Sequence, residues 1–352
     1  MGIQIGAAGS LPVLGATPML YVAAKGVDTI DALFLSTFDG TQWTPSSGAD
    51  AAPIPGEQSA TGVGLAACVG VTDVFGLFET TKRVPFVVTA WASNQSLQYH
   101  CYLNPGGPFA ADQGGGAIPV GQSGGAVGGP GIAVDGSSNT IYAAWPSPGE
   151  SVFNFQPLFL ATGVLQTPSA GGDILQWQSD VQAIPEALSG DAPGIAKFGN
   201  ALYVAWKNQD SQDLFVAHLL NGTWHTDRAI PGQSNCGPAL AVAGGNLVAA
   251  WVDAATDNIF LSRNIPFHED ALFEWSPSTI VQFKNSNAPP LTKYSPALAT
   301  FDGQLCLVWA DISKTGGVAK APFGVVEWAM QNADGTWTYN GVVPGLFTGP
   351  DF

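Results

Sequence analysis

Residues 192–234 read APGIAKFGNALYVAWKNQDSQDLFVAHLLNGTWHTDRAIPGQS, and the next part of the chain repeats this pattern. The second copy begins with GPALAVAGGNLVAAWVDAATDNIFLSRN at residues 237–264 and ends with ALFEWSPSTIV at residues 271–281. In both copies a proline precedes a tryptophan by 13 positions: Pro193 with Trp206, and Pro238 with Trp251. Self-similarity of this kind is typical of repeat folds, in which one supersecondary unit is stacked many times.

The same frame, a proline, an apolar run that ends in an anchor residue, and then a second aromatic residue, can be followed along the rest of the sequence. Each repeat has an anchor residue that ends an apolar run, in order Lys25, Trp91, Trp145, Trp206, Trp251 and Trp309. A second aromatic residue follows a polar turn, in order Trp43, Phe109, Trp177, Trp224, Trp275 and Trp337. The first repeat is placed on Pro12, 13 positions before Lys25. The segments that join the repeats also recur, as IPGEQS at Ile54, IPVGQS at Ile118, IPEALS at Ile184, IPGQS at Ile230 and a weaker IVQFKNS at Ile280.

These positions predict six repeats, spanning residues 10–58, 59–122, 123–188, 189–233, 234–285 and 286–345 of one domain. Within each repeat the apolar residues alternate with a period of two, which indicates short strands separated by Gly, Asn, Asp and Pro. Four strands per repeat predict an all-β, six-bladed β-propeller of four-stranded antiparallel blades. Seven blades are the second choice, because the second and third repeats carry long insertions. The segment MGIQIG at the N-terminus is a candidate closing strand.

Composition narrows the classes of function. The chain has 352 residues with 44 glycines and 26 prolines, and only 11% of its residues are charged. A net charge of −16 works against binding to nucleic acid or to anionic membrane surfaces, both of which need clustered Lys and Arg. No apolar run is long enough for a transmembrane helix. No signal peptide is visible, so we expect a cytoplasmic protein or one released by a non-classical route.

The cysteines and histidines do not form a recognisable metal site. Cys68, Cys101, Cys236 and Cys306 are far apart and lack CxxC spacing, so buried reduced thiols are expected. The four histidines show no paired ligand spacing. We therefore expect neither a metal nor another cofactor.

The repeat pattern, Pro-Ala, Leu-Tyr-Val-Ala-Trp, Asp, Leu-Phe and Asp-Gly-Thr-Trp in order, resembles the tandem repeats of bacterial and fungal β-propeller lectins. That group is typified by the Photorhabdus and Psathyrella velutina lectins. The resemblance implies shallow sugar sites that recur around the ring between neighbouring blades. The chain lacks the acidic calcium loops of the Psathyrella type, and its repeat lengths are irregular. From the resemblance and the repeated Asp and Trp positions we expect a multivalent lectin without catalysis, which binds glycans at several non-identical sites between blades or on one rim. The second tryptophan of each repeat is expected nearer the rim, and a homo-oligomer is left open.

The polar loop after each anchor and the second aromatic are the candidate sugar-binding positions. A carboxylate accepts hydrogen bonds from sugar hydroxyls, and an aromatic face packs against the C–H side of a pyranose ring. The alternative is that each Asp makes turn contacts and each Trp packs in the core. The candidate ligand-binding residues are Asp31, Trp43, Asn94, Asp213, Trp224, Asp257, Trp275, Asp311 and Trp337.

Two other classes of function stay open. A propeller glycoside hydrolase or lyase would use one pair of carboxylates in the central channel, drawn from Glu150, Glu274, Glu327 and Asp311. A scaffold for protein interactions would bind no small ligand. A sialidase is excluded, because its Asp-box spacing is absent and the three arginines are scattered. The GQSGG match at Gly121 lies in a repeated joint and is not a nucleophile elbow.

Overall fold

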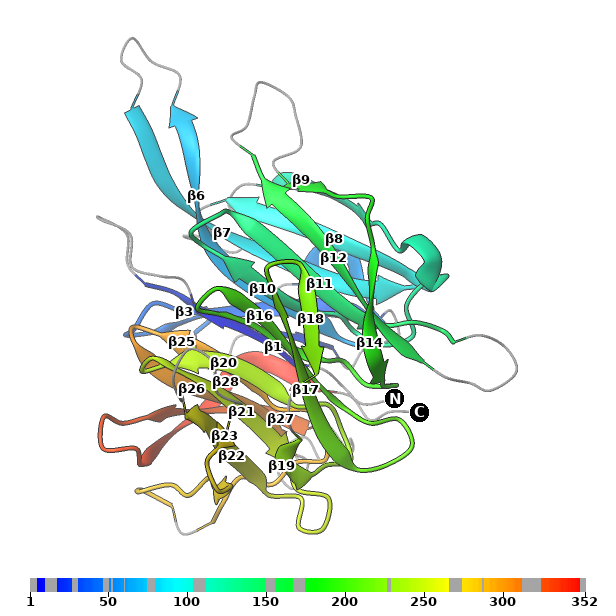
Figure 1. Cartoon of the computed structure of the whole chain (residues 1–352). Helices are drawn as coiled ribbons and strands as arrows, with labels where there is room; N and C mark the ends of the chain where they lie inside the picture. Colours follow the sequence, from blue (N-terminus) through cyan, green and yellow to red (C-terminus); the bar gives the residue numbers. More distant parts are fainter. Residues whose placement is uncertain are drawn as a thin grey trace.

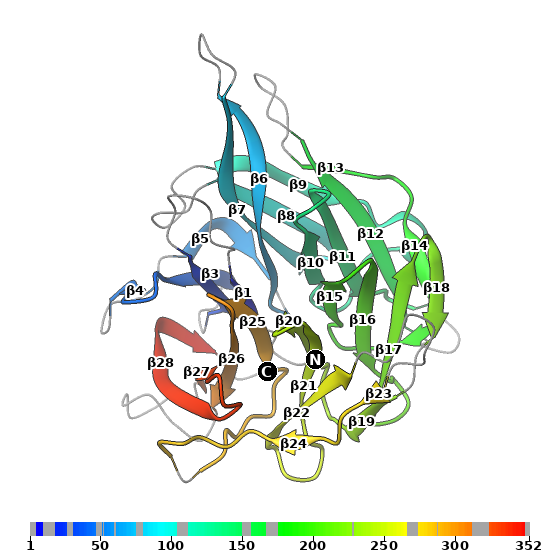
Figure 2. The same ribbon diagram turned by 60° about the vertical axis from the view of Figure 1, so that its left-hand side comes forward.

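The computed structural model describes residues 5–9, 18–26, 31–46, 51, 53–59, 61–74, 80–103, 112–149, 156–166, 175–226, 229–265, 274–286, 288–311 and 324–348. The predicted six-bladed β-propeller is confirmed. The described strands form six antiparallel sheets arranged around a common centre (Figures 1 and 2), and the described residues contain no α-helix. No described helix is therefore long and apolar enough to cross a membrane.

The first three sheets, or blades, follow the chain in order. Blade 1 contains β1 (Ile5–Gly9), β2 (Leu20–Lys25), β3 (Ala32–Phe38), β4 (Trp43–Thr44) and β5 (Pro53–Gln58). Blade 2 contains β6 (Val63–Val74), β7 (Thr80–Ser93), β8 (Ser96–Leu103) and β9 (Asp112–Ile118). Blade 3 contains β10 (Gly131–Asp135), β11 (Thr140–Pro146), β12 (Pro157–Leu165), β13 (Leu175–Trp177) and β14 (Gln182–Leu188).

The other three blades repeat this arrangement. Blade 4 contains β15 (Gly194–Phe198), β16 (Ala201–Lys207), β17 (Asp213–Leu220), β18 (Thr223–Thr226) and β19 (Ile230–Gln233). Blade 5 contains β20 (Ala239–Ala243), β21 (Asn246–Val252), β22 (Ile259–Ile265), β23 (Glu274–Trp275) and β24 (Thr279–Ile280). Blade 6 contains β25 (Ala297–Phe301), β26 (Gln304–Asp311), β27 (Gly324–Gln331) and β28 (Trp337–Thr348).

The first strand of every blade lies at the centre of the ring. β1, β6, β10, β15, β20 and β25 each contact the first strands of the two neighbouring blades, and β25 meets β1 to close the ring. Glycine permits this close approach at several blades. A Cβ added to Gly131 would lie 2.2 Å from the Pro193 carbonyl oxygen of the next blade, so no larger residue fits there.

The anchor tryptophans pack in the core between blades, as one of the two sequence interpretations proposed. Trp91, Trp145, Trp206, Trp251 and Trp309 are all at most 7% exposed. They end the second strands, whose residues are almost all buried because both faces meet a neighbouring blade.

The strand pairing in blade 1 corrects the positions that the sequence predicted for the first repeat. β1 pairs with β2 as the inner strand of blade 1, so the N-terminal segment opens this blade. Ala24 pairs with Phe34, as Trp206 pairs with Phe215, so Ala24 and not Lys25 holds the anchor position. Pro12 and Phe109, which the frame also used, lie outside the described residues. The second-repeat insertion lengthens the β6–β7 hairpin, which projects from the ring in Figure 1.

The repeated joints are built on one serine each. The Oγ atoms of Ser59, Ser123, Ser189 and Ser234 accept a hydrogen bond from the backbone N–H two residues later, at 3.1–3.3 Å. All four serines are buried. These are Ser-turns that lead the chain into the next inner strand. Ser123 of the GQSGG match belongs to this set and therefore has a structural role.

Candidate functional site

The position opposite the anchor tryptophan distinguishes blade 6 from its neighbours. In blades 3, 4 and 5 a phenylalanine occupies this position and its ring stacks on the indole, with centroids 6.0–6.4 Å apart. The pairs are Trp145 with Phe159, Trp206 with Phe215, and Trp251 with Phe260. In blade 6 the residue opposite Trp309 is Glu327, which is 1% exposed. Blade 2 has the half-buried Gln98 opposite Trp91, so among the described residues blade 6 alone places a buried carboxylate at this position.

The joint before blade 6 is longer than the others. Ile230 and Ser234 are four positions apart, whereas Ile280 is twelve positions from Thr292. Thr292 is 1% exposed, and its Oγ1 accepts the N–H of Tyr294 at 3.1 Å, so it holds the place of the joint serine. The predicted start of the sixth repeat at Ser286 therefore falls inside an inserted segment. We call residues 283–286 and 288–291 the strap.

The strap lies across blade 6 and is held by hydrogen bonds to β28. Asn285 clamps the backbone of Tyr339 twice: its Nδ2 donates to the Tyr339 carbonyl at 2.9 Å, and its Oδ1 accepts from the Tyr339 N–H at 3.0 Å. The N–H of Lys284 donates to the Trp337 carbonyl at 2.8 Å. The Lys284 ammonium lies 3.0 Å from Asp334 in the turn before β28. Four contacts thus fix one half of the strap.

A cavity of about 130 Å³ lies between the strap and the strands β26, β27 and β28. Phe283 of the strap stacks on the Trp309 indole with centroids 5.6 Å apart, which replaces the missing cross-strand phenylalanine. Pro289, Pro290 and Leu291 form the rest of the strap wall. Trp309, Asp311, Glu327 and Tyr339 form the blade wall.

Two buried carboxylates share this blade wall. Asp311 is 6% exposed and lies two positions after Trp309 on β26, so both side chains are on one face of the sheet. Glu327 lies opposite Trp309 on β27 and shares this face. The Tyr339 hydroxyl donates a 2.8 Å hydrogen bond to Glu327 Oε1, which fixes that carboxylate against the ring. The site therefore combines a pair of acids with aromatic walls.

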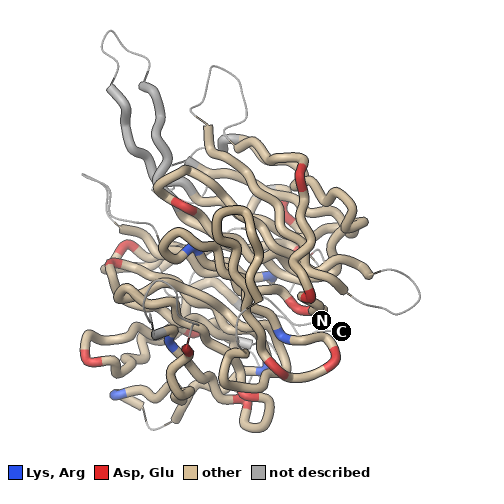
Figure 3. The backbone as a smooth tube through the Cα atoms, viewed as in Figure 1, with Lys and Arg blue, Asp and Glu red and all other residues tan. Residues whose placement is uncertain are grey.

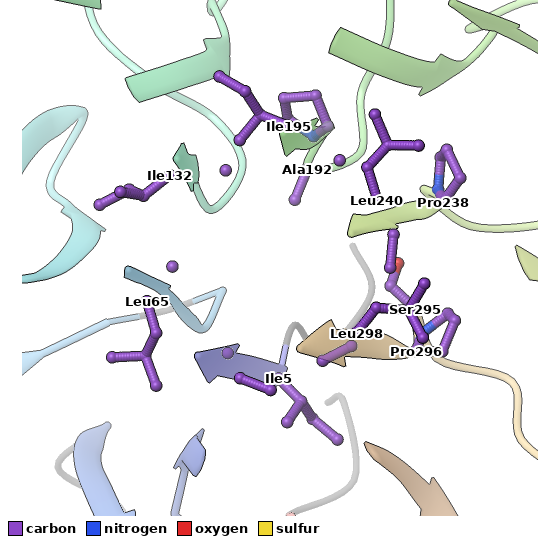
Figure 4. A pocket seen from close by; sticks show the side chains of 18 residues that line it. Ile5, Leu65, Ile132, Ala192, Ile195, Pro238, Leu240, Ser295, Pro296 and Leu298 are labelled. Atoms are coloured by element: carbon purple, nitrogen blue, oxygen red, sulfur yellow. The ribbon is translucent and has the colours of Figure 1, made fainter. Parts of the chain in front are cut away.

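The central channel has a different character. Its cavity of about 70 Å³ is ringed by one aliphatic side chain from each blade (Figure 4): Ile5, Leu65, Ile132, Ile195, Leu240 and Leu298. None of the residues that line it is a carboxylate. The described acids that the sequence offered for a channel site, Asp311, Glu274 and Glu327, therefore do not line this cavity. Of the four acids considered, Glu150 lies outside the described residues and Glu274 is exposed on β23.

The acidic residues predicted for the loops make local contacts. Asp31 pairs with Lys25 at 2.7 Å, and its carbonyl accepts the N–H of the joint Ser59 at 2.9 Å. Asp213 accepts hydrogen bonds from Gln233 and Ser211, which in this order of importance lower the pKa of its carboxyl.

The other two loop candidates lie at turns with a left-handed backbone. The carbonyl of Asp257 accepts the N–H of Thr292 at 3.0 Å, so this aspartate serves the joint as Asp31 does. Asp257 has a φ of 57°, and Asn94 has a φ of 49° in the turn between β7 and β8. Asp and Asn tolerate this conformation better than most residues, which explains their presence.

The second set of tryptophans packs against the blades. Trp43 meets Trp328 edge to face at a centroid distance of 5.2 Å. Trp224 and Trp275 pack against the cores between blades 3 and 4 and between blades 4 and 5. Trp337 is 4% exposed in the same core as Trp309, which corrects its expected place at a rim. Of the nine candidate residues, Asp311 and Trp337 lie in blade 6, and Asp311 alone lines the cavity.

A second buried glutamate lies between blades 1 and 2. Glu57 is 2% exposed, and its Oε1 accepts hydrogen bonds from Thr89 and Tyr102, both at 2.8 Å, with His100 Nδ1 at 3.5 Å. It lies two positions before the joint Ser59, where the corresponding residues of other joints are Gly121, Ala187 and Gly232. Glu57 lines neither described cavity, so its contacts tie two blades together. The acidic residues marked in Figure 3 are scattered over the ring. Within the described residues, no group of three His, Cys, Asp or Glu side chains could hold a metal ion.

No known protein family and no curated protein matches the chain. Several solved structures are similar to the chain at low sequence identity. The GH43 enzyme from Xanthomonas citri complexed with xylose is 14% identical with a TM-score of 0.45, covering 77% of this chain and 89% of that one. The α-L-arabinofuranosidase from Lactobacillus brevis is 15% identical with a TM-score of 0.45, covering 74% and 92%. A chain of the nidogen–laminin complex is 12% identical with a TM-score of 0.48, covering 94% of both.

The prediction of a multivalent lectin without catalysis is wrong. Most of the similar structures are named as glycoside hydrolases, among them GH43 and GH32 enzymes. The described residues also do not show similar acid and aromatic pairs repeated around the ring, which a multivalent lectin requires. They show one pair of buried carboxylates, Asp311 and Glu327, on the wall of a single cavity.

The sequence contained a signal for this site that the repeat frame did not use. The short apolar run Leu-Phe or Ile-Phe follows the polar loop in blades 1, 4 and 5, at Leu33, Leu214 and Ile259. The sixth repeat has Val326-Glu327 at the same register. Glu327 was among the acids considered for an enzyme, but its partner could be chosen only once the strap was placed.

Proposed function

We propose that the chain is a glycoside hydrolase that uses Asp311 and Glu327 as its pair of acids. The observation that carries this proposal is the buried Glu327 at a position where blades 1, 3, 4 and 5 have phenylalanine. An array of blades does not need a buried carboxylate there, and burying an acid costs free energy. The residue therefore has a reason other than packing, and the cavity beside it supplies one.

The chemistry of glycoside hydrolysis fits this pair of residues. Such enzymes need two carboxyl groups on either side of the scissile bond, one as a general acid and the other as a base or nucleophile. Asp311 and Glu327 come from neighbouring strands of one sheet, so the rigid ladder fixes their separation. The rings of Phe283, Trp309 and Tyr339 pack on one another and give the cavity an aromatic wall, as sugar sites commonly have. Apart from the two acids, the residues that line the cavity are uncharged, which suits a neutral glycan.

The experiment is a screen of p-nitrophenyl glycosides with purified protein, read as released p-nitrophenol. The panel includes β-xylosides, α-L-arabinofuranosides and β-fructofuranosides, the sugars that appear in the names of similar structures. Asp311→Asn and the matched control Glu274→Gln are assayed beside the wild type, since Glu274 is an exposed acid on blade 5. We expect hydrolysis of one glycoside class that Asp311→Asn abolishes and Glu274→Gln leaves intact. Folded protein without activity on any glycoside would overturn the proposal.

A further inference from the structure

Tyr339 is a further departure from the repeat, on the same blade as Glu327. The second tryptophan of blade 6, Trp337, pairs with the residue four positions after Glu327 on β27, and the second tryptophans of blades 1, 3, 4 and 5 pair at the same register. Two positions after this tryptophan those four blades have, in order, Pro45, Ser179, Thr226 and Pro277. Of these five blades, blade 6 alone has an aromatic residue there. Glu327, the strap and Tyr339 thus depart from the repeat together.

The strap holds Tyr339 in place. The tyrosine ring packs against Phe283 of the strap, with centroids 5.6 Å apart, and against Trp309 of β26 at 6.2 Å. Asn285 of the strap holds the Tyr339 backbone through two hydrogen bonds. The hydroxyl at the far end of the ring donates to Glu327 Oε1 at 2.8 Å. A line of contacts therefore runs from the strap through Tyr339 to the carboxylate.

A second tyrosine–glutamate hydrogen bond shows what such a contact does away from a cavity. Tyr102 donates to Glu57 at 2.8 Å, but these residues belong to blades 2 and 1, and neither lines a described cavity. That bond joins two blades. Tyr339 and Glu327 lie on β28 and β27, which a backbone ladder already joins, and both line the cavity. The effect of their bond is therefore on the orientation of the carboxylate.

We propose that Tyr339 is a positioning residue for the reaction: its hydroxyl holds the Glu327 carboxylate in its reactive orientation, and the strap holds the tyrosine. This inference rests on the proposed glycoside hydrolase function. A hydroxyl that donates to one oxygen of a carboxylate restricts rotation about the last torsion of the side chain, which is otherwise broad. A reacting group that is misplaced by about 1 Å can lose about 100-fold in rate. The strap therefore contributes to the rate of reaction as well as to the shape of the cavity.

Matched substitutions test this role. Tyr339→Phe and Tyr102→Phe each remove one hydroxyl that donates to a buried glutamate, and each keeps the ring. On the best glycoside of the screen, we expect Tyr339→Phe to lower kcat about 10- to 100-fold, the effect of losing a hydrogen bond to a charged group, with little change in KM. Tyr102→Phe should lower the melting temperature and leave kcat unchanged. A folded Tyr339→Phe protein with the kcat of wild type would overturn the inference.

A rescue experiment separates orientation of the carboxylate from packing of the ring. In Glu327→Ala, formate is a carboxylate small enough for the space of the deleted group, where it can accept a hydrogen bond from Tyr339. We expect sodium formate, with sodium chloride at the same concentration as the control, to restore part of the lost activity. The double variant of Glu327→Ala with Tyr339→Phe should lose this rescue. Equal rescue in both variants would show that Tyr339 does not orient the carboxylate.

These outcomes distinguish the inference from the proposed function. If the protein hydrolyses a glycoside and Tyr339→Phe is as active as wild type, the inference fails and the proposed function stands. If folded wild-type protein hydrolyses no glycoside, both fail.

Discussion

Glu327 lies across the β26–β27 ladder from Trp309, at the position where blades 3, 4 and 5 stack a phenylalanine on the equivalent tryptophan. The Tyr339 hydroxyl donates to this glutamate at 2.8 Å, and Phe283 of the strap takes over the stacking on the indole. One replacement in the repeat and one insertion between repeats thus produce the site together.

If Glu327 is present for chemistry, the fold should not need it. We expect Glu327→Leu combined with Tyr339→Phe to keep the free energy of unfolding within about 1 kcal/mol of wild type, because replacing both partners of a buried hydrogen bond by apolar groups of similar shape is nearly neutral. Glu327→Ala alone should lose about 2 kcal/mol or more, because it leaves a cavity and removes the acceptor of the Tyr339 hydroxyl. Urea denaturation measures both. A double variant much less stable than Glu327→Ala would show that Glu327 is structural.

The strap should depend on Asn285. Asn285→Ala removes both hydrogen bonds to the Tyr339 backbone, each worth about 0.5–1.5 kcal/mol. We expect faster hydrogen exchange at the Tyr339 amide and a higher KM. Asn235→Ala is the matched control, since Asn235 Nδ2 likewise bonds a backbone carbonyl, that of Ala254 at 3.2 Å, away from the strap. Unchanged exchange at Tyr339 in Asn285→Ala would contradict this account of the strap.

The acidic turn that anchors the strap should respond to pH. The Thr336 hydroxyl, followed by Lys284, lowers the pKa of Asp334 from 3.8 to about 2. A depressed folded-state pKa gives stability that is present above pH 3.8 and is lost as the pH falls through about 2. NMR titration of the carboxyl carbons should place the Asp334 midpoint near 2, and Thr336→Val should raise it.

Asp39 is the internal comparison for this titration, since its turn has the same Asp-Gly-Thr sequence without a lysine partner. The Thr41 hydroxyl, followed by the backbone N–H groups of Gln42 and Thr41, lowers its pKa to about 2. We expect added salt to raise the Asp334 midpoint more than the Asp39 midpoint, because only Asp334 pairs with a cation. Equal shifts would show that Lys284 does not hold the turn.

The described thiols should be unreactive in the folded protein. Cys101, Cys236 and Cys306 are free and buried, and burial raises the pKa of Cys236 to about 11 and that of Cys306 to about 12. Thiol reagents attack the thiolate, which is scarce at pH 8. In a Cys68→Ser background, we expect negligible labelling by Ellman's reagent in native protein and three equivalents after denaturation. Rapid native labelling would contradict the burial of these cysteines.

The sequence predicted the ring because the residues that build it repeat. Trp145, Trp206 and Trp251 recur because the core between each pair of blades needs a large apolar side chain. The joint serines recur because the chain makes the same turn before each new inner strand. The first anchor was placed one position late, at Lys25, because Ala24 has lost the tryptophan and its register is visible only from its pairing with Phe34.

The site could not be predicted from the same repetition, since a functional site departs from it. The strap is inserted before Thr292, so the joint residue is Thr292 and not the predicted Ser286. No pattern of spacing could show that the strap residues lie over Glu327. The loop aspartates looked like sugar ligands because they recur, but Asp31 and Asp257 recur for their turns. Glu327 differs from its counterparts, and that difference carries the function proposed here.

The most direct measurement is kcat/KM of Glu327→Gln on the best glycoside of the screen, with Glu274→Gln as the control acid. The account predicts a fall of at least about 100-fold for Glu327→Gln, the usual contribution of a general acid or base, with a melting temperature near that of wild type. Wild-type activity in a folded Glu327→Gln protein would contradict the placement of the active site in blade 6.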